Sequence, residues 1–406
     1  MAVDLWRGYR RPQQDDIPAG WTVKRLREIA SLTAGGRLGL TMSDFKQIGY
    51  PAYSAEGLTG FVDQAEFKGP AVIVSSIGEK CGKCFYAEGE FTTLANVQVV
   101  FPNTDAIDPY YLWSLVNDAR FWPRAQTAQP FIRPSDIKKS WIPIPTDSEQ
   151  IAISELLRLT DKALDAARAE LLAAQRLKTA LMQQLFTKGI PGRHKDFKET
   201  KIGKVPGEWD ILRGRQCIEI KGLYSPVPYD AGEEGDCHYL KVSDFNLSGN
   251  EKIIRTSQTK FWRNKQNESR LYPPGLIAIA KRGEALKHNR VRFTGAFSMI
   301  DPNIMLLDAI EGVTFNQYLY HYLLYRGMAR FCEDAGIPQL NNKDIYPRWF
   351  PMPKMDEQMK IVEILEAADS YIFSVSNKVS ALERLKKSLL QNLLTGKVRV
   401  NREAQV

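Results

Sequence analysis

The side chains best suited to chemistry in this sequence are few and scattered. Cys81 and Cys84 have the Cys-x-x-Cys spacing of a zinc or redox pair, and Cys237 stands next to His238. A structural zinc site needs four ligands, and no second such pair follows at a suitable spacing. A thioredoxin-type pair should open a helix, whereas this pair falls in an expected hairpin. We therefore expect no metal site and no redox centre in this chain.

Motifs for nucleotide binding and group transfer are also missing. Thr395-Gly396-Lys397 lacks the upstream glycine of a phosphate-binding loop. Tyr272-Pro273-Pro274-Gly275 resembles an amino-methyltransferase tetrapeptide, but it lacks the leading Asn or Asp that would accept hydrogen bonds from the target amine. No nucleophile constellation surrounds any of the four histidines, which are His194, His238, His288 and His321. The sequence therefore predicts a non-catalytic chain that binds no cofactor itself.

Two loops carry residues that can bind DNA. Residues 76–83 follow the apolar segment 71–75, and residues 281–290 follow the apolar segment 276–280. Glycine, short polar and basic residues after a buried strand are typical of a hairpin that projects donors into a DNA groove. Arg and Lys pair with guanine, and Asn pairs with adenine. A solvated hairpin tip has a similar composition, so both interpretations stay open.

The candidate DNA-binding residues come from these two loops and from the borders of the regions that contain them. The loops contribute Ser76, Lys80, Lys83, Lys281, Arg282, Lys287, Asn289 and Arg290. The borders contribute Arg37, Gln129, Arg133, Asn341 and Lys343.

The elements that must position these residues come from an internal duplication. Residues 130–190 align without a gap to residues 338–398, and about a third of the aligned positions are identical. Upstream, the Pro-x-x-Trp segment ending at Trp21 returns as the one ending at Trp209. The predicted order is a variable block and a shared helix, followed by a second variable block and a second shared helix.

Each shared segment predicts one long helix. A Pro-x-Pro element precedes it; Thr146 with Glu149 fits a capping box, and Asp356 is the expected N-cap of the second copy. Nearly 40 residues without proline or glycine then give about 60 Å of helix. The apolar period is seven, which predicts a coiled coil. The first copy repeats at Leu157, Leu164, Leu171, Lys178 and Leu185 and at Thr160, Ala167, Ala174 and Leu181; the second at Leu365, Ile372, Val379, Lys386 and Leu393 and at Ala368, Val375, Leu382 and Leu389.

The alternative is that each helix packs across its own globular domain. An antiparallel pairing of the two copies is favoured, because a globular block joins the helices in one chain. The resulting rod would hold two domains apart, related by a pseudo-twofold. Lys178 and Lys386 occupy the same core position in the two copies, which indicates a register-setting role.

The variable blocks both predict a mixed α/β fold. In the first, buried strands are expected at 71–75 and 97–101, and a helix follows Asp108-Pro109. In the second, strands are expected at 276–280 and 304–307, with a helix near 315–324. The fold class is therefore α/β (mixed α+β), with two globular domains and an antiparallel coiled coil. The predicted boundaries are 1–145, the helix 146–190, 191–353, and the helix with its tail 354–406.

Composition limits the remaining possibilities. The chain has 406 residues, with 44% hydrophobic and 25% charged residues, as in an ordinary globular protein. Long apolar stretches and a secretory signal are missing and the cysteines number only five, so a cytoplasmic location is expected. The net charge of +8 fits an anionic partner, but residues 31–128 sum to −3. The charge alone therefore does not distinguish a DNA-binding protein from an ordinary solvated surface.

Together, these segments resemble the DNA specificity subunit of type I restriction–modification systems. The Pro-x-Pro and Glu-Gln entry, the heptad helix ending at 185–189, and the segment 197–209 carry the resemblance, and 393–397 repeats the helix ending. The resemblance covers nearly the whole chain. It implies that the variable blocks are two target recognition domains, each for one half of a bipartite DNA sequence.

The resemblance also implies partners. In this family the coiled coil sets the spacer and docks two modification subunits, which carry S-adenosylmethionine and methylate adenine. Restriction subunits add ATP- and Mg-dependent translocation and cleavage, and the specificity subunit has no activity of its own. The net charge of −3 over the first block implies that its DNA face is a local patch, or that partners supply phosphate contacts. A stand-alone DNA-binding or scaffold protein with a duplicated reader is the alternative, whereas an autonomous methyltransferase or nuclease would need the missing motifs.

Overall fold

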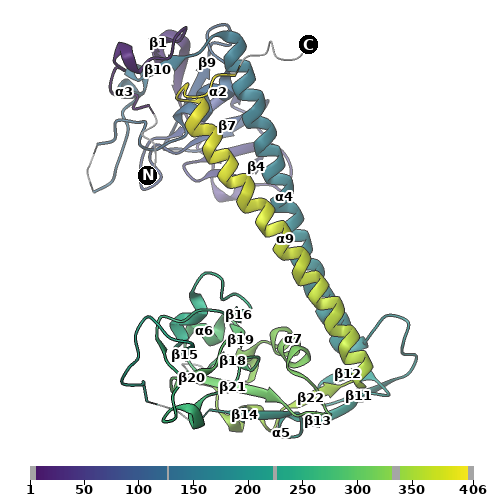
Figure 1. Ribbon diagram of the computed structural model, residues 1–406. Helices are drawn as coiled ribbons and strands as arrows, with labels where there is room; N and C mark the ends of the chain where they lie inside the picture. The colour runs from purple at the N-terminus through teal and green to yellow at the C-terminus, as the bar shows by residue number, and fades with distance from the viewer. Residues whose placement is uncertain (1–5, 126–127, 223–225, 332–338, 401–406) are drawn as a thin grey trace, which may run out of the picture. The chain divides into compact units, whose positions relative to one another are not determined.

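The computed structural model describes residues 6–125, 128–222, 226–331 and 339–400. They form two compact units. The first comprises residues 1–169 and 377–406, and the second comprises residues 170–376. Each unit is an α/β domain together with part of two long helices, α4 (Asp147–Lys188) and α9 (Met355–Leu393) (Figure 1).

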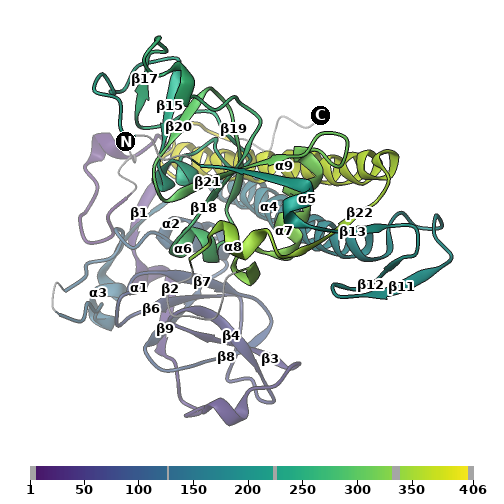
Figure 2. The same cartoon turned by 90° about the horizontal axis from the view of Figure 1, so that it is seen from below.

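The first unit is built on two four-stranded sheets. One has the order β2-β9-β6-β7 and the other the order β4-β3-β8-β5, while β1 and β10 form a separate pair (Figure 2). The elements are β1 (Thr22–Arg25), α1 (Leu26–Ile29), β2 (Ala30–Ala34), β3 (Tyr50–Ser54), β4 (Gly57–Val62), β5 (Phe67–Lys68), β6 (Ala71–Ser75), β7 (Cys84–Ala87), β8 (Glu90–Thr93), β9 (Val97–Pro102), α2 (Pro109–Val116), α3 (Pro134–Lys139) and β10 (Trp141–Ile144).

The expected elements of the first block are confirmed. All five residues of β6 are buried, as an apolar run of that length predicts for a strand covered on both faces. The carboxylate of Asp108 caps α2 by accepting hydrogen bonds from the backbone N–H groups of Tyr110 and Tyr111. Pro109 follows at the first helical position, where its missing N–H costs nothing.

The second unit contains a five-stranded sheet of order β14-β21-β18-β19-β16 and a three-stranded sheet of order β17-β15-β20. Its elements are β11 (Phe197–Thr200), β12 (Gly203–Pro206), β13 (Asp210–Arg213), α5 (Gly214–Cys217), β14 (Ile218–Lys221), β15 (Cys237–Leu240), β16 (Ile253–Ile254), β17 (Lys260–Phe261), β18 (Ile277–Ala280), α6 (Glu284–Lys287), β19 (Val291–Thr294), β20 (Ser298–Ile300), β21 (Ile304–Ala309), α7 (Asn316–Arg326), α8 (Asn342–Ile345) and β22 (Trp349–Met352). The strands and the helix expected for this block are confirmed within one or two residues.

Corresponding elements of the two units pair in the same way. β1 pairs antiparallel with β10, and β13 pairs antiparallel with β22. The indole N–H of Trp21 donates to the buried carboxylate of Glu149 at 2.9 Å, and that of Trp209 donates to Glu357 at 3.0 Å. The repeated Trp and Glu residues of the sequence are therefore a repeated buried contact at the start of each long helix.

The two long helices run antiparallel within each unit. In the first unit, Asp161 of α4 pairs with Lys386 of α9, and the later Arg168 pairs with the earlier Glu383. In the second unit, Lys178 of α4 pairs with Asp369 of α9, and the earlier Glu170 accepts a hydrogen bond from the hydroxyl of the later Tyr371 at 2.8 Å. Each of the eighteen heptad positions named from the sequence is buried or half-buried. The predicted coiled coil is thereby confirmed.

The lysines at the heptad core have carboxylate partners. The pair of Lys178 with Asp369 lies in the second unit, with side chains 16% and 23% exposed. The equivalent pair of Lys386 with Asp161 lies in the first unit at 2.5 Å. A buried ammonium group needs a carboxylate at the level of its own helical turn on the facing helix. Each ion pair therefore favours a single register of the two helices.

Thr146 directly precedes α4, as expected, but the predicted capping box does not form, and the cap predicted at Asp356 was wrong. The Glu149 carboxylate does not close a capping box with Thr146, because Trp21 and Arg399 occupy it instead. Asp356 lies inside the first turn of α9, which begins at Met355, and its carboxylate accepts a hydrogen bond from Arg193. In both cases a tertiary contact takes the carboxylate that a local cap would use. No helix within the described part of the chain combines the length and apolarity that a membrane crossing requires.

Candidate nucleic-acid interface

The loop predicted from the sequence in the first unit lies with its neighbours at one end of the β2-β9-β6-β7 sheet. Gln98 at the start of β9 pairs with Ala34 at the end of β2 and with Val74 near the end of β6. Val74 also pairs with Cys84 at the start of β7. The loops at 35–37, 76–83 and 94–96 therefore lie at the same end of the sheet, because each antiparallel strand starts beside the end of its neighbour.

A further segment joins this end through backbone hydrogen bonds. The N–H of Gly78 donates to the carbonyl of Pro130 at 2.9 Å, and the N–H of Ile132 donates to the carbonyl of Ser76 at 2.9 Å. The N–H of Ser76 in turn donates to the carbonyl of Asn96 at 3.0 Å. We define the first loop edge as residues 35–37, 76–83, 94–96 and 128–133.

Basic side chains of the first loop edge are exposed. Lys80 and Lys83 are exposed on the hairpin between β6 and β7, and the ammonium of Lys83 lies 5.2 Å from the centroid of the Phe85 ring. Arg133 is exposed at the start of α3, and the side chain of Arg37 is 62% exposed, 3.6 Å from the Glu66 carboxylate. Gln129 is exposed as well. The structure therefore brings together five of the six residues predicted for this block on one accessible surface.

The sixth, Ser76, is buried, and its hydroxyl donates to the carbonyl of Asn96 at 3.0 Å. Its contact with Asn96 holds the base of the hairpin against the neighbouring turn. Cys81 and Cys84 are also buried, and their thiols donate to backbone carbonyl oxygens. Burial raises the pKa of both thiols, which keeps them protonated as core residues.

The second unit repeats this arrangement. Lys221 at the end of β14 pairs with Leu306, Ala280 at the end of β18 pairs with Ile304, and β19 starts opposite Ile279. The loop that follows β18, the turn before β21 and the C-terminal end of β14 therefore lie at the same end of the five-stranded sheet. We define the second loop edge as residues 281–290, 301–303 and 339–343.

The hydrogen bonds of the second loop edge match those of the first. The N–H of Lys281 donates to the carbonyl of Asn303 at 2.7 Å, and the N–H of Leu340 donates to the carbonyl of Lys281 at 2.8 Å. Arg282 forms a β-bridge with Gln339, as Ile77 does with Phe131 in the first unit. Lys281 thus occupies the backbone position of Ser76, so the two units present equivalent loops that differ in side chain.

The basic residues of the second loop edge differ in exposure. Arg282, Lys287 and Lys343 are exposed, whereas Lys281 and Arg290 are half-buried. Lys281 lines a cavity of about 210 Å³ together with Gly222 and Asn342 of the neighbouring segments. The connection between β18 and β19 is not a bare hairpin, because its residues 284–287 form the short helix α6.

Two asparagines of the second loop edge have structural contacts. Asn289 has a φ of 50°, and its side-chain amide donates to the carbonyl of Leu324 at 2.9 Å. Its amide oxygen accepts from the N–H of Met328 at 2.8 Å, so both ends of the side chain hold the end of α7. Asn341 precedes α8, and its backbone N–H donates to the carboxylate of Asp344 at 2.7 Å.

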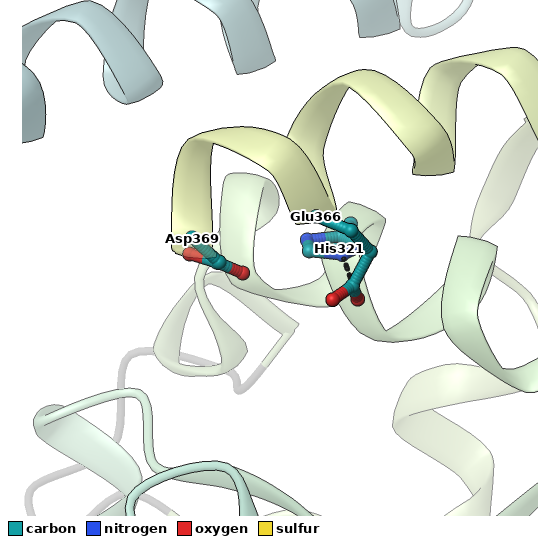
Figure 3. A group of neighbouring side chains, drawn as sticks. All are labelled: His321, Glu366 and Asp369. Atoms are coloured by element: carbon teal, nitrogen blue, oxygen red, sulfur yellow. Dashed lines mark hydrogen bonds and ion pairs between the residues drawn. The ribbon is translucent and has the colours of Figure 1, made fainter. Parts of the chain in front are cut away.

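One cluster in the described part of the second unit has the residue types of a metal site. His321 of α7 approaches Glu366 and Asp369 of α9, and its Nε2 lies 3.0 Å from the Glu366 carboxylate (Figure 3). Lys252 forms an ion pair with Glu366, and Lys178 forms one with Asp369. The hydrogen bond with His321, together with Lys252, lowers the pKa of Glu366 to about 2, although burial opposes this shift. Both carboxylates are therefore neutralised by lysines, and the cluster joins the domain to its helix.

Three arginines of the first unit lie outside the set of residues predicted from the sequence. Arg7, Arg120 and Arg124 line a pocket of about 420 Å³. In the sequence, only the arginine-bearing segment 7–11 indicates a basic site here, because Arg120 and Arg124 are brought to that segment by tertiary packing.

Comparisons with known proteins agree with the fold. Residues 18–174 match the family model of the type I restriction modification DNA specificity domain. A putative type I restriction enzyme MjaX specificity subunit from Methanocaldococcus jannaschii is 24% identical, over 97% of this chain and 97% of the relative. The type I restriction enzyme EcoDI specificity subunit from Escherichia coli is 20% identical, over 94% and 89%.

Solved structures share the fold. The crystal structure of a type I restriction–modification S subunit from M. genitalium superimposes with a TM-score of 0.64 at 16% identity. The alignment covers 95% of this chain and 98% of the M. genitalium chain. A chain from a structure describing complex assembly and conformational transition of the type I R-M system gives a TM-score of 0.56, with 95% and 100% covered.

Proposed function

We propose, on the premise that this chain belongs to the family of type I restriction enzyme specificity subunits, that it is the DNA-reading subunit of a restriction–modification complex. Each loop edge contacts one half of a bipartite DNA sequence. The chain itself performs no catalysis and binds no cofactor; S-adenosylmethionine, ATP and Mg belong to partner subunits. The proposed complex works in the cytoplasm, where its DNA is.

The observation that carries this proposal is the equivalence of the two loop edges. The same three backbone hydrogen bonds or bridges hold the loops of both units, at the same end of corresponding sheets. Duplicated scaffolds that present different side chains suit the reading of two different short sequences. The first loop edge presents Lys80, Lys83 and Arg133, whereas the second presents Arg282, Lys287 and Arg290. We therefore propose that the target is asymmetric.

The helices supply the surface for the modification subunits. Along α9 in the second unit, Met359 is 61% exposed and Phe373 is 68% exposed, and Leu177 on α4 is 58% exposed. In the first unit Leu159 is 64% exposed. Large apolar side chains on a helix face are typical of a protein–protein contact. We propose that two modification subunits dock there and that restriction subunits join them.

Methylation mapping tests this function. A host that lacks other adenine methyltransferases receives this chain together with its modification subunits, and its genome is sequenced for modified adenines. We expect one asymmetric bipartite motif with a fixed spacer. The matched control carries the modification subunits alone and should show no motif. A palindromic motif, or a motif with one half only, would overturn the proposal.

A mobility-shift assay separates this function from that of a stand-alone DNA-binding protein. The chain is added to DNA that contains the mapped motif, with and without modification subunits. We expect tight, specific binding only with the modification subunits present. Tight specific binding by the chain alone would favour the stand-alone reader.

A further inference from the structure

A basic pocket lies on the first unit outside the loop edge. Arg7, Tyr9, Arg120, Trp122 and Arg124 line it together with Pro123, and its volume is about 420 Å³. Among the described residues that line the pocket, none is a carboxylate. Such a lining favours an anionic ligand, in a region of the chain whose net charge is negative.

The wall of the pocket is built by close backbone packing. The N–H of Gly8 donates to the carbonyl of Phe121 at 2.9 Å, and the N–H of Trp141 donates to the carbonyl of Gly8 at 2.7 Å. A Cβ at position 8 would lie 2.5 Å from the Phe121 ring, so only glycine lets the segment approach this closely. Trp122 beneath is buried, and its indole N–H donates to the carbonyl of Val116 at 3.0 Å. Arg7 and Tyr9 are thereby held opposite Arg120 and Arg124.

The polar side chains that line the pocket are N–H and O–H donors. Arg7 donates to the hydroxyl of Tyr9 at 3.0 Å, which leaves the Tyr9 O–H proton available for an acceptor. Asp118 holds Arg120 through a contact of 2.6 Å. Burial alone would raise the pKa of Asp118, but the hydrogen bonds with Arg120 lower it. Arg124 is exposed, and its planar fork of N–H donors matches two oxygens of a phosphate.

The pocket is continuous with the first loop edge. Ala125, directly after Arg124, donates its N–H to the carbonyl of Phe131 at 3.0 Å. Phe131 also forms a β-bridge with Ile77 on the hairpin that carries Lys80. The pocket therefore adjoins the first loop edge.

We propose that the pocket of Arg7, Tyr9, Arg120 and Arg124 binds a phosphate of the DNA backbone beside the half-site of the first loop edge. This inference rests on the proposed function and adds a contact that positions the DNA without reading its sequence. It also places basic side chains beside the loop edge of the first block, where residues 31–128 have a net charge of −3.

The test uses the chain assembled with its modification subunits. Binding constants are measured from 50 to 300 mM KCl for two duplexes, one with the mapped motif and one with a scrambled sequence. We expect Arg124→Gln and Arg7→Gln each to reduce the slope of log K against log salt by about 1, equally on both duplexes. Arg27→Gln is the matched control, because Arg27 is an exposed arginine of the same unit that does not line the pocket.

Several results would overturn the inference. They are an unchanged slope, an effect confined to the motif duplex, or an equal loss of slope in the Arg27→Gln control. A variant that loses its modification subunits on gel filtration would assign the pocket to a protein contact instead. Failure of the proposed function is a separate result, because the unaltered complex would then bind both duplexes equally, whatever the slopes of the variants.

Discussion

The ion pair between Lys178 and Asp369 offers the sharpest test of how the long helices are held together. It joins α4 to α9 in the second unit, at a position that the heptad pattern reserves for apolar side chains. The perturbations are Lys178→Met, Asp369→Leu, and the combination of these two substitutions. They remove the ammonium, the carboxylate charge, or both.

The magnitude follows from the exposure of the two side chains, which is 16% for Lys178 and 23% for Asp369. Breaking a fully buried pair costs about 3–5 kcal/mol, and breaking an exposed one about 0–1 kcal/mol. We expect Asp369→Leu to cost about 2–3 kcal/mol, because the Lys178 ammonium loses its partner. Lys178→Met should cost about 1 kcal/mol, because Asp369 keeps Lys252 at 3.9 Å. The apolar double variant should stay within about 1 kcal/mol of the parent.

Native-state hydrogen exchange of peptides from 170–188 and 355–376 measures these free energies locally, which suits a chain whose two units need not unfold together. The double-mutant cycle should give a coupling of about 2–4 kcal/mol, which is the sum of the two single costs less the cost of the double variant. The same cycle on Arg168 and Glu383 is the control, since their side chains are 53% and 49% exposed, and it should give about 0.5 kcal/mol or less. A coupling for Lys178 and Asp369 no larger than this control would refute the reasoning.

Three further predictions concern single residues. Glu366→Gln should lower the melting temperature of the second unit at pH 7 by an amount equivalent to about 1 kcal/mol or less, because the carboxylate is 35% exposed. The pKa of Glu366 is lowered to about 2 in the folded state, from its ordinary value of 4.5. The carboxylate therefore stabilises the fold above pH 4.5, and this stabilisation is lost as the pH falls from about 5 towards 2. A difference in melting temperature between variant and parent that grows on acidification would contradict this. Phe373→Ser should weaken co-purification of the modification subunits without lowering the melting temperature, whereas Ile48→Ser, at a residue 86% exposed on a loop, should change neither. Arg290→Ala should relax specificity at one base at a cost of about 1–3 kcal/mol; an equal loss on all sequences in the same binding assay would make Arg290 a phosphate contact.

The candidate interface was predictable in part. Apolar runs followed by basic loops located both hairpins, because a buried strand and its exposed connection differ in composition over a few residues. The roles of single side chains were not predictable. Ser76 and Asn289 have types that suit base contacts, yet their polar atoms bond to neighbouring backbone. Whether a polar side chain faces solvent depends on which segments surround it, and those segments are distant in sequence.

The long helices also combine features that could be predicted from the sequence with features that could not. The heptad repeats and the repeated lysines could be predicted from the sequence, because helical periodicity is a local property. The carboxylates that neutralise those lysines, Asp369 and Asp161, lie on the other helix and were paired only by the antiparallel packing. The predicted caps failed for a related reason, since Trp21 and Arg193 from outside the helices take the carboxylates of Glu149 and Asp356.

The sequence by itself determined the duplication, the two long amphipathic helices and the two loops with the chemistry of a DNA contact. These follow from periodicity, repeated motifs and local composition. Only the tertiary structure decided that loops from three or four separate segments meet at one end of each sheet, and that Arg7 lies opposite Arg120 and Arg124. The physical reason is that strand order and register place residues together by hydrogen bonds between distant segments, and no local pattern in the sequence specifies those partners.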